Sequence, residues 1–127
     1  LTEETFMATI TPTIDRDSVP GVVLASWADL ATNDVGAGVP IAYAADLTGQ
    51  VSGTFGGGTV TWQGSNDNVN WHPMTQRGGT TNMAFTAAAV HTANENPAWI
   101  RPAVTSGTSV AIDCTLAIHA RYAKAPY

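Results

Sequence analysis

The sequence predicts an all-β domain, an antiparallel β-sandwich of Ig-like or jelly-roll-like type with an irregular N-terminal arm. Apolar and polar residues alternate with period two along several segments, which is typical of half-buried strands. Clusters of Gly, Pro, Asn and Asp separate these segments, as expected for turns. Strand patterns far outnumber helical ones. We therefore expect six to eight short strands and little helix.

The length and composition indicate one folded domain. The chain has 127 residues, of which 44% are hydrophobic and 12% charged, and a chain of this size can bury a core of its own. We assign residues 1–21 to an N-terminal strand and extended arm, and residues 22–127 to a single β-sandwich domain.

The N-terminal region is the least regular part of the sequence. Residues 5–11 alternate weakly, whereas residues 11–21 contain two prolines and three charged residues and predict an exposed connection or arm. Such an arm is either a plain surface loop or an extended contact with a neighbouring molecule. The candidate contact residues in it are Pro12, Ile14, Arg16, Val19 and Pro20.

Residues 22–30 predict a strand rather than a short helix. Pro20 and Gly21 precede the segment, and its β-branched and aromatic residues prefer a pleated surface. Trp27 lies in this strand, and its pattern leaves open whether the indole belongs to the core or to an interface.

A glycine-rich stretch joins the next two predicted strands. Residues 47–55 and 59–63 both alternate, and Gly56, Gly57 and Gly58 stand between them. A phosphate-binding loop would lead into a helix and end with a lysine, but these glycines lead into a β-branched strand. We interpret the stretch as a hairpin. Residues 64–70, with Asn66, Asp67 and Asn68 at their centre, predict a turn before the chain continues at Trp71.

Two further strands close the domain. Residues 99–105 form the first, and Pro102 predicts an edge position or a strand end because proline donates no ladder hydrogen bond. Residues 106–109 then predict a hairpin turn. Residues 110–122 alternate over their whole length, and Cys114 falls in phase with the apolar residues, which favours a buried thiol over a reactive one.

The same periodicity assigns the large side chains. The predicted core residues are Phe55, Val60, Trp62, Ile112, Leu116 and Ile118. Trp99 has the opposite parity from Ile100, so Trp99 and Arg101 join Trp27 as candidate interface residues.

Charge and residue spacing exclude several functions. The net charge of −5 disfavours nucleic acid, and no apolar run approaches the roughly 20 residues that a membrane span needs. The three histidines are scattered and there is one cysteine, so we expect no catalytic residues, no metal, no cofactor and no enzymatic activity. Residues 1–67 hold eight acidic residues and one basic residue, whereas residues 68–127 hold two and four. This asymmetry either averages out in the fold or polarises a docking surface.

A succession of motifs resembles a family of small structural proteins of tailed bacteriophages. The motifs are DLTGQVSGTFGGGTVTWQGSNDNVNW at residues 46–71, NPAWIRP at residues 96–102 and LAIHAR at residues 116–121. The resemblance covers about residues 40–122. The family often has Asp-Gly where this chain has Asp67-Asn68, and Asn is the residue after Gly that best tolerates a positive φ.

The resemblance implies a β-sandwich that decorates a phage head. Its expected partner is the major capsid protein, on whose outer surface it binds as a homo-oligomer, a dimer or trimer, and its expected location is the virion, assembled in the host cytoplasm. A tail or neck component of the virion is one alternative. The turn at residues 64–71 also resembles that of discoidin-like β-sandwiches, so a carbohydrate-binding or host-surface-binding module is another.

Overall fold

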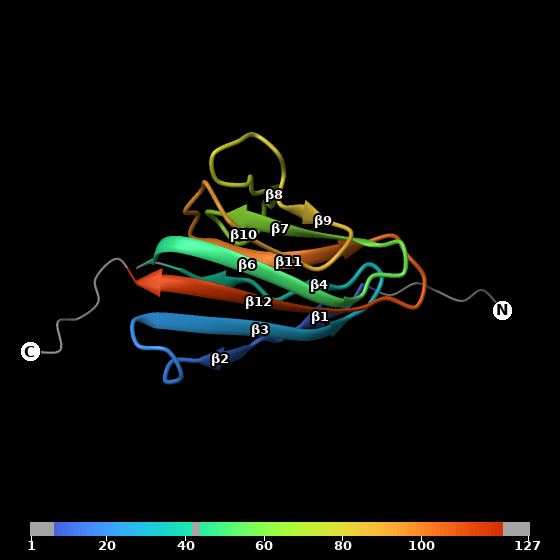
Figure 1. Cartoon of the computed structure of the whole chain (residues 1–127), viewed down its shortest axis with the longest axis horizontal. Coiled ribbons are helices and arrows are strands. Elements are labelled where there is room, and N and C mark those ends of the chain that lie inside the picture. The colour runs from blue at the N-terminus through green and yellow to red at the C-terminus, as the bar shows by residue number, and fades with distance from the viewer. Residues whose placement is uncertain (1–6, 42–43, 121–127) are drawn as a thin grey trace, which may run out of the picture.

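The computed structural model describes residues 7–41 and 44–120, and it confirms the predicted fold class. Two β-sheets pack face to face as a sandwich (Figure 1). The described residues contain twelve strands, more than predicted, because several connections include two-residue strands. Among the described residues, none forms a helix long and apolar enough to cross a membrane.

Sheet B has five strands, and all of its strand pairs are antiparallel. In spatial order they are β10 (Ala89–Thr92), β6 (Ala44–Thr54), β12 (Ala111–Ala120), β3 (Val22–Leu30) and β2 (Thr13–Asp15). The longest strands of the molecule, β6 and β12, lie side by side at its centre (Figure 1).

Sheet A has seven strands, of which the two longest have seven residues each. Its main order is β1 (Thr9–Ile10), β4 (Val35–Gly36), β11 (Trp99–Thr105), β7 (Thr59–Ser65) and β8 (His72–Pro73). In addition, β5 (Val39–Pro40) pairs with β11, and β9 (Ala84–Phe85) pairs with β7. The pair β1–β4 is parallel, whereas the other pairs of this sheet are antiparallel.

The two predicted hairpins are wrong, because both connections pass from one sheet to the other. β6 belongs to sheet B and β7 to sheet A, while β11 belongs to sheet A and β12 to sheet B. The glycine turn is tight: Gly58 N donates to Phe55 O at 2.7 Å, with φ of +55° at Gly56 and +81° at Gly57. Its geometry is that of a hairpin turn with two left-handed central residues, but the flanking strands diverge into separate sheets.

Pro102 lies in an interior strand, contrary to the predicted edge position. β11 pairs along its whole length with β7, and on its other side with β4 and β5. These two short strands are interrupted opposite Pro102, since β4 ends at Gly36 and β5 begins at Val39. A Cβ added at Gly36 would lie 2.6 Å from Pro102 Cδ. The missing N–H therefore faces the break in the neighbouring strand, where no ladder bond is lost.

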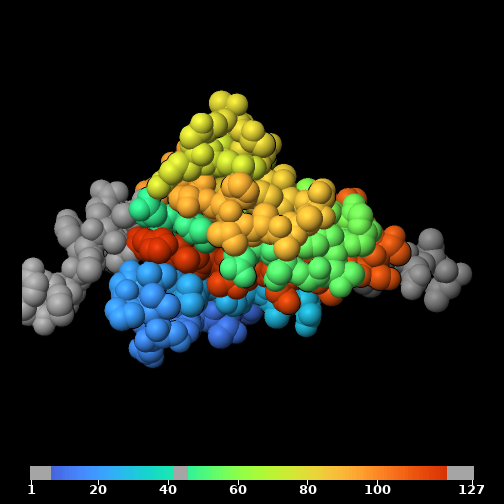
Figure 2. All heavy atoms as spheres, viewed as in Figure 1, coloured from blue at the N-terminus to red at the C-terminus, as the bar shows by residue number. Residues whose placement is uncertain are grey.

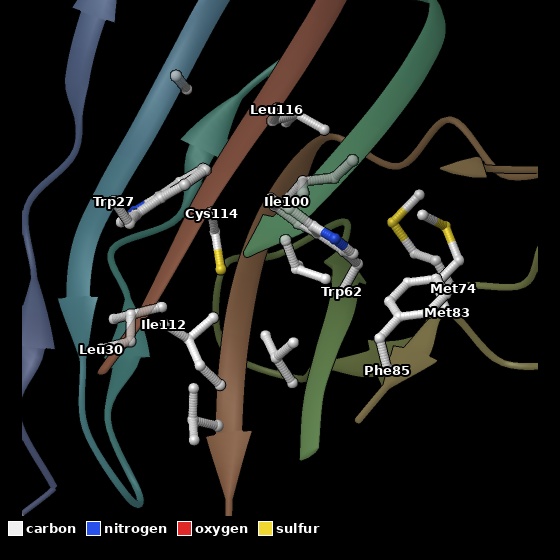
Figure 3. Close-up of a cluster of buried hydrophobic side chains, with 14 of the residues drawn as sticks. Trp27, Leu30, Trp62, Met74, Met83, Phe85, Ile100, Ile112, Cys114 and Leu116 are labelled. Atoms are coloured by element: carbon white, nitrogen blue, oxygen red, sulfur yellow. The ribbon is translucent and has the colours of Figure 1, made fainter. Parts of the chain in front are cut away.

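The core lies between the sheets and is centred on two tryptophans (Figure 3). Trp27 and Trp62 pack edge to face, with ring centroids 5.8 Å apart and an interplanar angle of 67°. The Trp27 side chain is completely buried, and its Nε1 donates to Ala37 O at 3.1 Å. This corrects the assignment of Trp27 to an interface.

The predicted core residues surround these rings. Val60, Trp62, Ile112 and Leu116 are buried, as is Cys114, whereas Phe55 and Ile118 are partly buried and pack against the cluster.

Part of the N-terminal arm is built into the sandwich. β1 pairs with β4 at the edge of sheet A, and β2 pairs with β3 at the edge of sheet B. The buried Asp34 anchors the first of these strands, because its carboxylate accepts hydrogen bonds from Ala8 N at 3.2 Å and Ala31 N at 2.9 Å. β2 and its turn into β3 remain largely exposed, as do the residues next to β1.

Candidate interaction surfaces

The loop between β7 and β8 is held by its own polar side chains. Ser65 Oγ donates to Asp67 Oδ1 at 2.8 Å and accepts from Asn68 N at 2.9 Å. Asp67 Oδ1 also accepts from Val69 N and Asn70 N, and Oδ2 accepts from Asn70 Nδ2. Asn68 takes the left-handed conformation with φ of +61°, a conformation that glycine adopts most readily and that asparagine also tolerates. The loop is a self-contained turn of the β7–β8 hairpin.

These donors hold the pKa of Asp67 well below its usual range. The backbone N–H of Asn70 has the largest effect, followed by the Asn70 side chain, Val69 N and Ser65 Oγ. Hydrogen bonds that require the ionised carboxylate stabilise the folded loop only while Asp67 is charged.

Asp67→Asn should destabilise the protein at neutral pH, and the difference should shrink in acid. The folded pKa is lower than the unfolded value of about 3.9, so the carboxylate contributes stability above about pH 4 and loses it as pH falls toward the folded pKa. Urea unfolding midpoints at pH 7 and pH 3 test this for both proteins. The matched control is Val69→Ala, an exposed change in the same loop. If the stability difference between Asp67→Asn and the wild type stayed constant with pH, the role assigned to the ionised Asp67 carboxylate would be contradicted.

A cleft of about 270 Å³ opens beside this loop. Its lining residues are Gly64, Ser65, Asn66, Asp67, Asn70, His72 and Pro97. Many of its polar atoms are already engaged: Asn66 Oδ1 accepts from Ala98 N, and both Asp67 oxygens serve the loop. The polar residues of the motif thus build the loop and join it to the segment before β11.

Trp71 lies across the outer face of sheet A and stacks on a cation. The Arg101 guanidinium carbon is 4.4 Å from the centroid of the Trp71 ring, and Arg101 Nε donates to Gln63 Oε1 at 2.9 Å. The far edge of the indole reaches Gly38, where an added Cβ would lie 2.8 Å from Trp71 Cη2. Partial burial lowers the pKa of Arg101. Trp99 occupies the same side of β11 as Arg101, because the two are separated by the buried Ile100.

These three residues, Trp71, Trp99 and Arg101, form what we call the Trp71–Arg101 cluster. Among the described residues, the only ion pair is Arg77–Asp46, so Arg101 faces solvent without a carboxylate partner. Residues 71 and 101 lie far apart in the sequence, and no local pattern signals that they meet.

The remaining candidate interface residues form a separate surface at the edge of sheet B. Asp15 Oδ1 accepts from Asp17 N and Ser18 N, which fixes the turn between β2 and β3. Ile14 and Val19 are 41% and 43% exposed, and they belong to the exposed large apolar residues of the described chain. Arg16 and Pro20 are exposed and Pro12 is half-buried. We call Ile14, Arg16, Asp17 and Val19 the arm surface.

The candidate chemical groups do not assemble into a reactive site among the residues described. Burial raises the pKa of the Cys114 thiol to about 12, with a smaller effect from the Asp113 charge, so the thiol is neutral and sealed in the core. His91 stacks on Phe85 with ring centroids 5.0 Å apart. Within residues 7–41 and 44–120, no three His, Cys, Asp or Glu side chains are grouped as metal ligands would be.

The described residues form a β-sandwich domain that carries the arm surface and, separately, the Trp71–Arg101 cluster. No protein-family model, no curated protein and no solved structure matches the chain.

Proposed function

We propose that the protein is a non-enzymatic structural component of a tailed-bacteriophage virion, a decoration protein that binds the outside of the major capsid shell as a homo-oligomer and stabilises it. The motifs at residues 46–71, 96–102 and 116–121 support the proposal by their resemblance to such proteins. The polar residues of the first motif form hydrogen bonds within the loop and stabilise its turn. Contacts with other molecules are therefore assigned to other parts of the surface.

The observation that carries the proposal is the pair of contact surfaces on one rigid sandwich. The arm surface lies at the edge of sheet B, and the Trp71–Arg101 cluster lies on the outer face of sheet A. A protein with two such surfaces can contact more than one neighbouring molecule at once. A layer of small proteins on the outside of a capsid shell requires this. Such a layer resists the pressure of packaged DNA by adding contact area across subunit boundaries, and it needs no catalytic group.

The test is binding to capsids of a phage whose genome encodes this chain. Purified protein should sediment with expanded, DNA-free capsids, appear as added density outside the shell by electron microscopy, and raise the temperature at which the shells break. Capsids of an unrelated phage are the control. Binding of the protein only to the tails or necks of phage particles would overturn the assignment to the head.

A further inference from the structure

The arm surface and the Trp71–Arg101 cluster complement each other in charge and in apolar character. The arm presents the exposed apolar residues Ile14 and Val19 on either side of Asp17. The cluster presents half-buried aromatic rings beside Arg101, a cation with no ion-pair partner in the part of the chain that the structure describes. An acidic, apolar protrusion therefore faces one way and a cationic, aromatic platform another.

Neither charged group has an ion-pair partner among the described residues. Asp17 donates its backbone N–H to Asp15, but its own carboxylate has no hydrogen-bond or ion-pair partner among residues 7–41 and 44–120. Arg101 uses Nε for Gln63, which leaves its terminal N–H groups in a fixed plane. A guanidinium oriented in this way matches the two oxygens of a carboxylate.

The two surfaces lie on different sheets of the molecule, and a contact of the cluster with the same cluster of a second copy is disfavoured. β2 lies at an edge of sheet B, and Figure 2 shows this blue segment along one border of the molecule, opposite the yellow loop between β8 and β9. Arg101 projects from the middle of sheet A. A two-fold contact between two clusters would bring the two Arg101 cations together, which electrostatics disfavours.

We propose that copies of this protein associate head to tail, with the arm surface of one copy docking on the Trp71–Arg101 cluster of the next and Asp17 pairing with Arg101. A contact between two different surfaces closes into a ring when the rotation allows it. The inference rests on the homo-oligomer of the proposed function and specifies which surfaces form it. Arg16 adjoins Asp17 in the arm surface and offsets its charge, but the segment 14–19 as a whole stays negative because it also contains Asp15.

A charge-swap cycle tests the contact, with sedimentation equilibrium measuring association. Asp17→Arg and Arg101→Asp should each weaken association at least about tenfold, and the double variant Asp17→Arg/Arg101→Asp should recover it. Wild-type association should also weaken as salt rises from about 0.05 to 0.5 M, because exposed charges are screened. Arg77→Gln removes an equal charge outside both surfaces and should have no effect.

Folding defects are separable from lost contacts. Asp17→Arg changes an exposed side chain that has no partner among the described residues, so its melting temperature at low protein concentration should match the wild type. If Arg101→Asp does not fold because the stacking on Trp71 is lost, Arg101→Gln is measured instead. It should weaken association on its own, and Asp17→Arg should then weaken association less in the Arg101→Gln background than in the wild type.

The possible results test the head-to-tail contact and the proposed function separately. A wild-type protein that stays monomeric at millimolar concentration, an oligomer insensitive to Asp17→Arg, or a double variant that fails to recover association would each overturn the head-to-tail contact. An oligomer that forms without this contact and still coats capsids would leave the proposed function standing. Loss of capsid binding with an intact, swap-sensitive oligomer would overturn the capsid assignment alone.

Discussion

Trp62→Ala is expected to lower the free energy of unfolding by about 3–5 kcal/mol, the usual range for deleting a buried aromatic side chain. Trp62 is 1% exposed, contacts Trp27 edge to face and lies at the centre of the cluster drawn in Figure 3. Its removal leaves a cavity between two sheets whose other large side chains are fixed in place. Urea denaturation followed by far-UV circular dichroism measures the loss.

Trp62→Phe is the matched control for that experiment. The Trp62 Nε1 atom is buried and has no hydrogen-bond partner within residues 7–41 and 44–120, and an unmade bond of this kind costs free energy in the folded state. Phenylalanine removes the unpaired N–H and retains much of the ring, so the loss should be clearly smaller than for alanine. Equal losses for the two variants would contradict this account of the site.

Gly49→Ala is expected to cost about 1–3 kcal/mol through overpacking at the same place. A Cβ at position 49 would lie 2.5 Å from Trp62 Cε2 and Nε1, a distance at which something must move. The indole is rigid and enclosed, so it cannot yield cheaply. Gly79→Ala is the control, since its added Cβ would meet only Thr81 N, at 4.0 Å, and it should be nearly neutral.

The two substitutions should be strongly non-additive. In a Trp62→Ala background the Cβ at position 49 points into the vacated space, so Gly49→Ala should cost much less than it does in the wild type. A double-mutant cycle from urea unfolding gives the coupling energy directly. Additive losses of stability would show that the Cβ added at position 49 clashes with a group other than the Trp62 ring.

The sequence predicts single strands well and their partners poorly. Residues 22–30 and 99–105 were expected as strands and form β3 and β11 with the same bounds, because period-two alternation and β-branched residues act locally. The assignment of strands to sheets depends on contacts between distant segments. Residues 55–58 show the limit, since their left-handed glycines build a hairpin-type turn whose flanking strands pair elsewhere.

For similar reasons, some residues of the candidate surfaces could be predicted from the sequence and others could not. Ile14 and Val19 are exposed, as an arm rich in prolines and charges suggests. Trp27 could not be placed because Val22, Val23 and Leu24 are apolar on both faces, and a β-bulge near Asp29, whose φ is +56°, shifts the phase of the strand. The stacking of Trp71 on Arg101 joins a loop to a strand, so only the fold reveals it.

The place of β12 in sheet B has a consequence for the time at which the molecule can fold. β12 lies between β6 and β3, which do not pair with each other, so it alone joins the two halves of that sheet. It is also the last described strand to leave the ribosome. A nascent chain that lacks it holds β3 and β6 as unjoined strands with open edges. Sheet B therefore closes only after residue 120 has been synthesised, and the earlier strands must avoid misassembly during that delay.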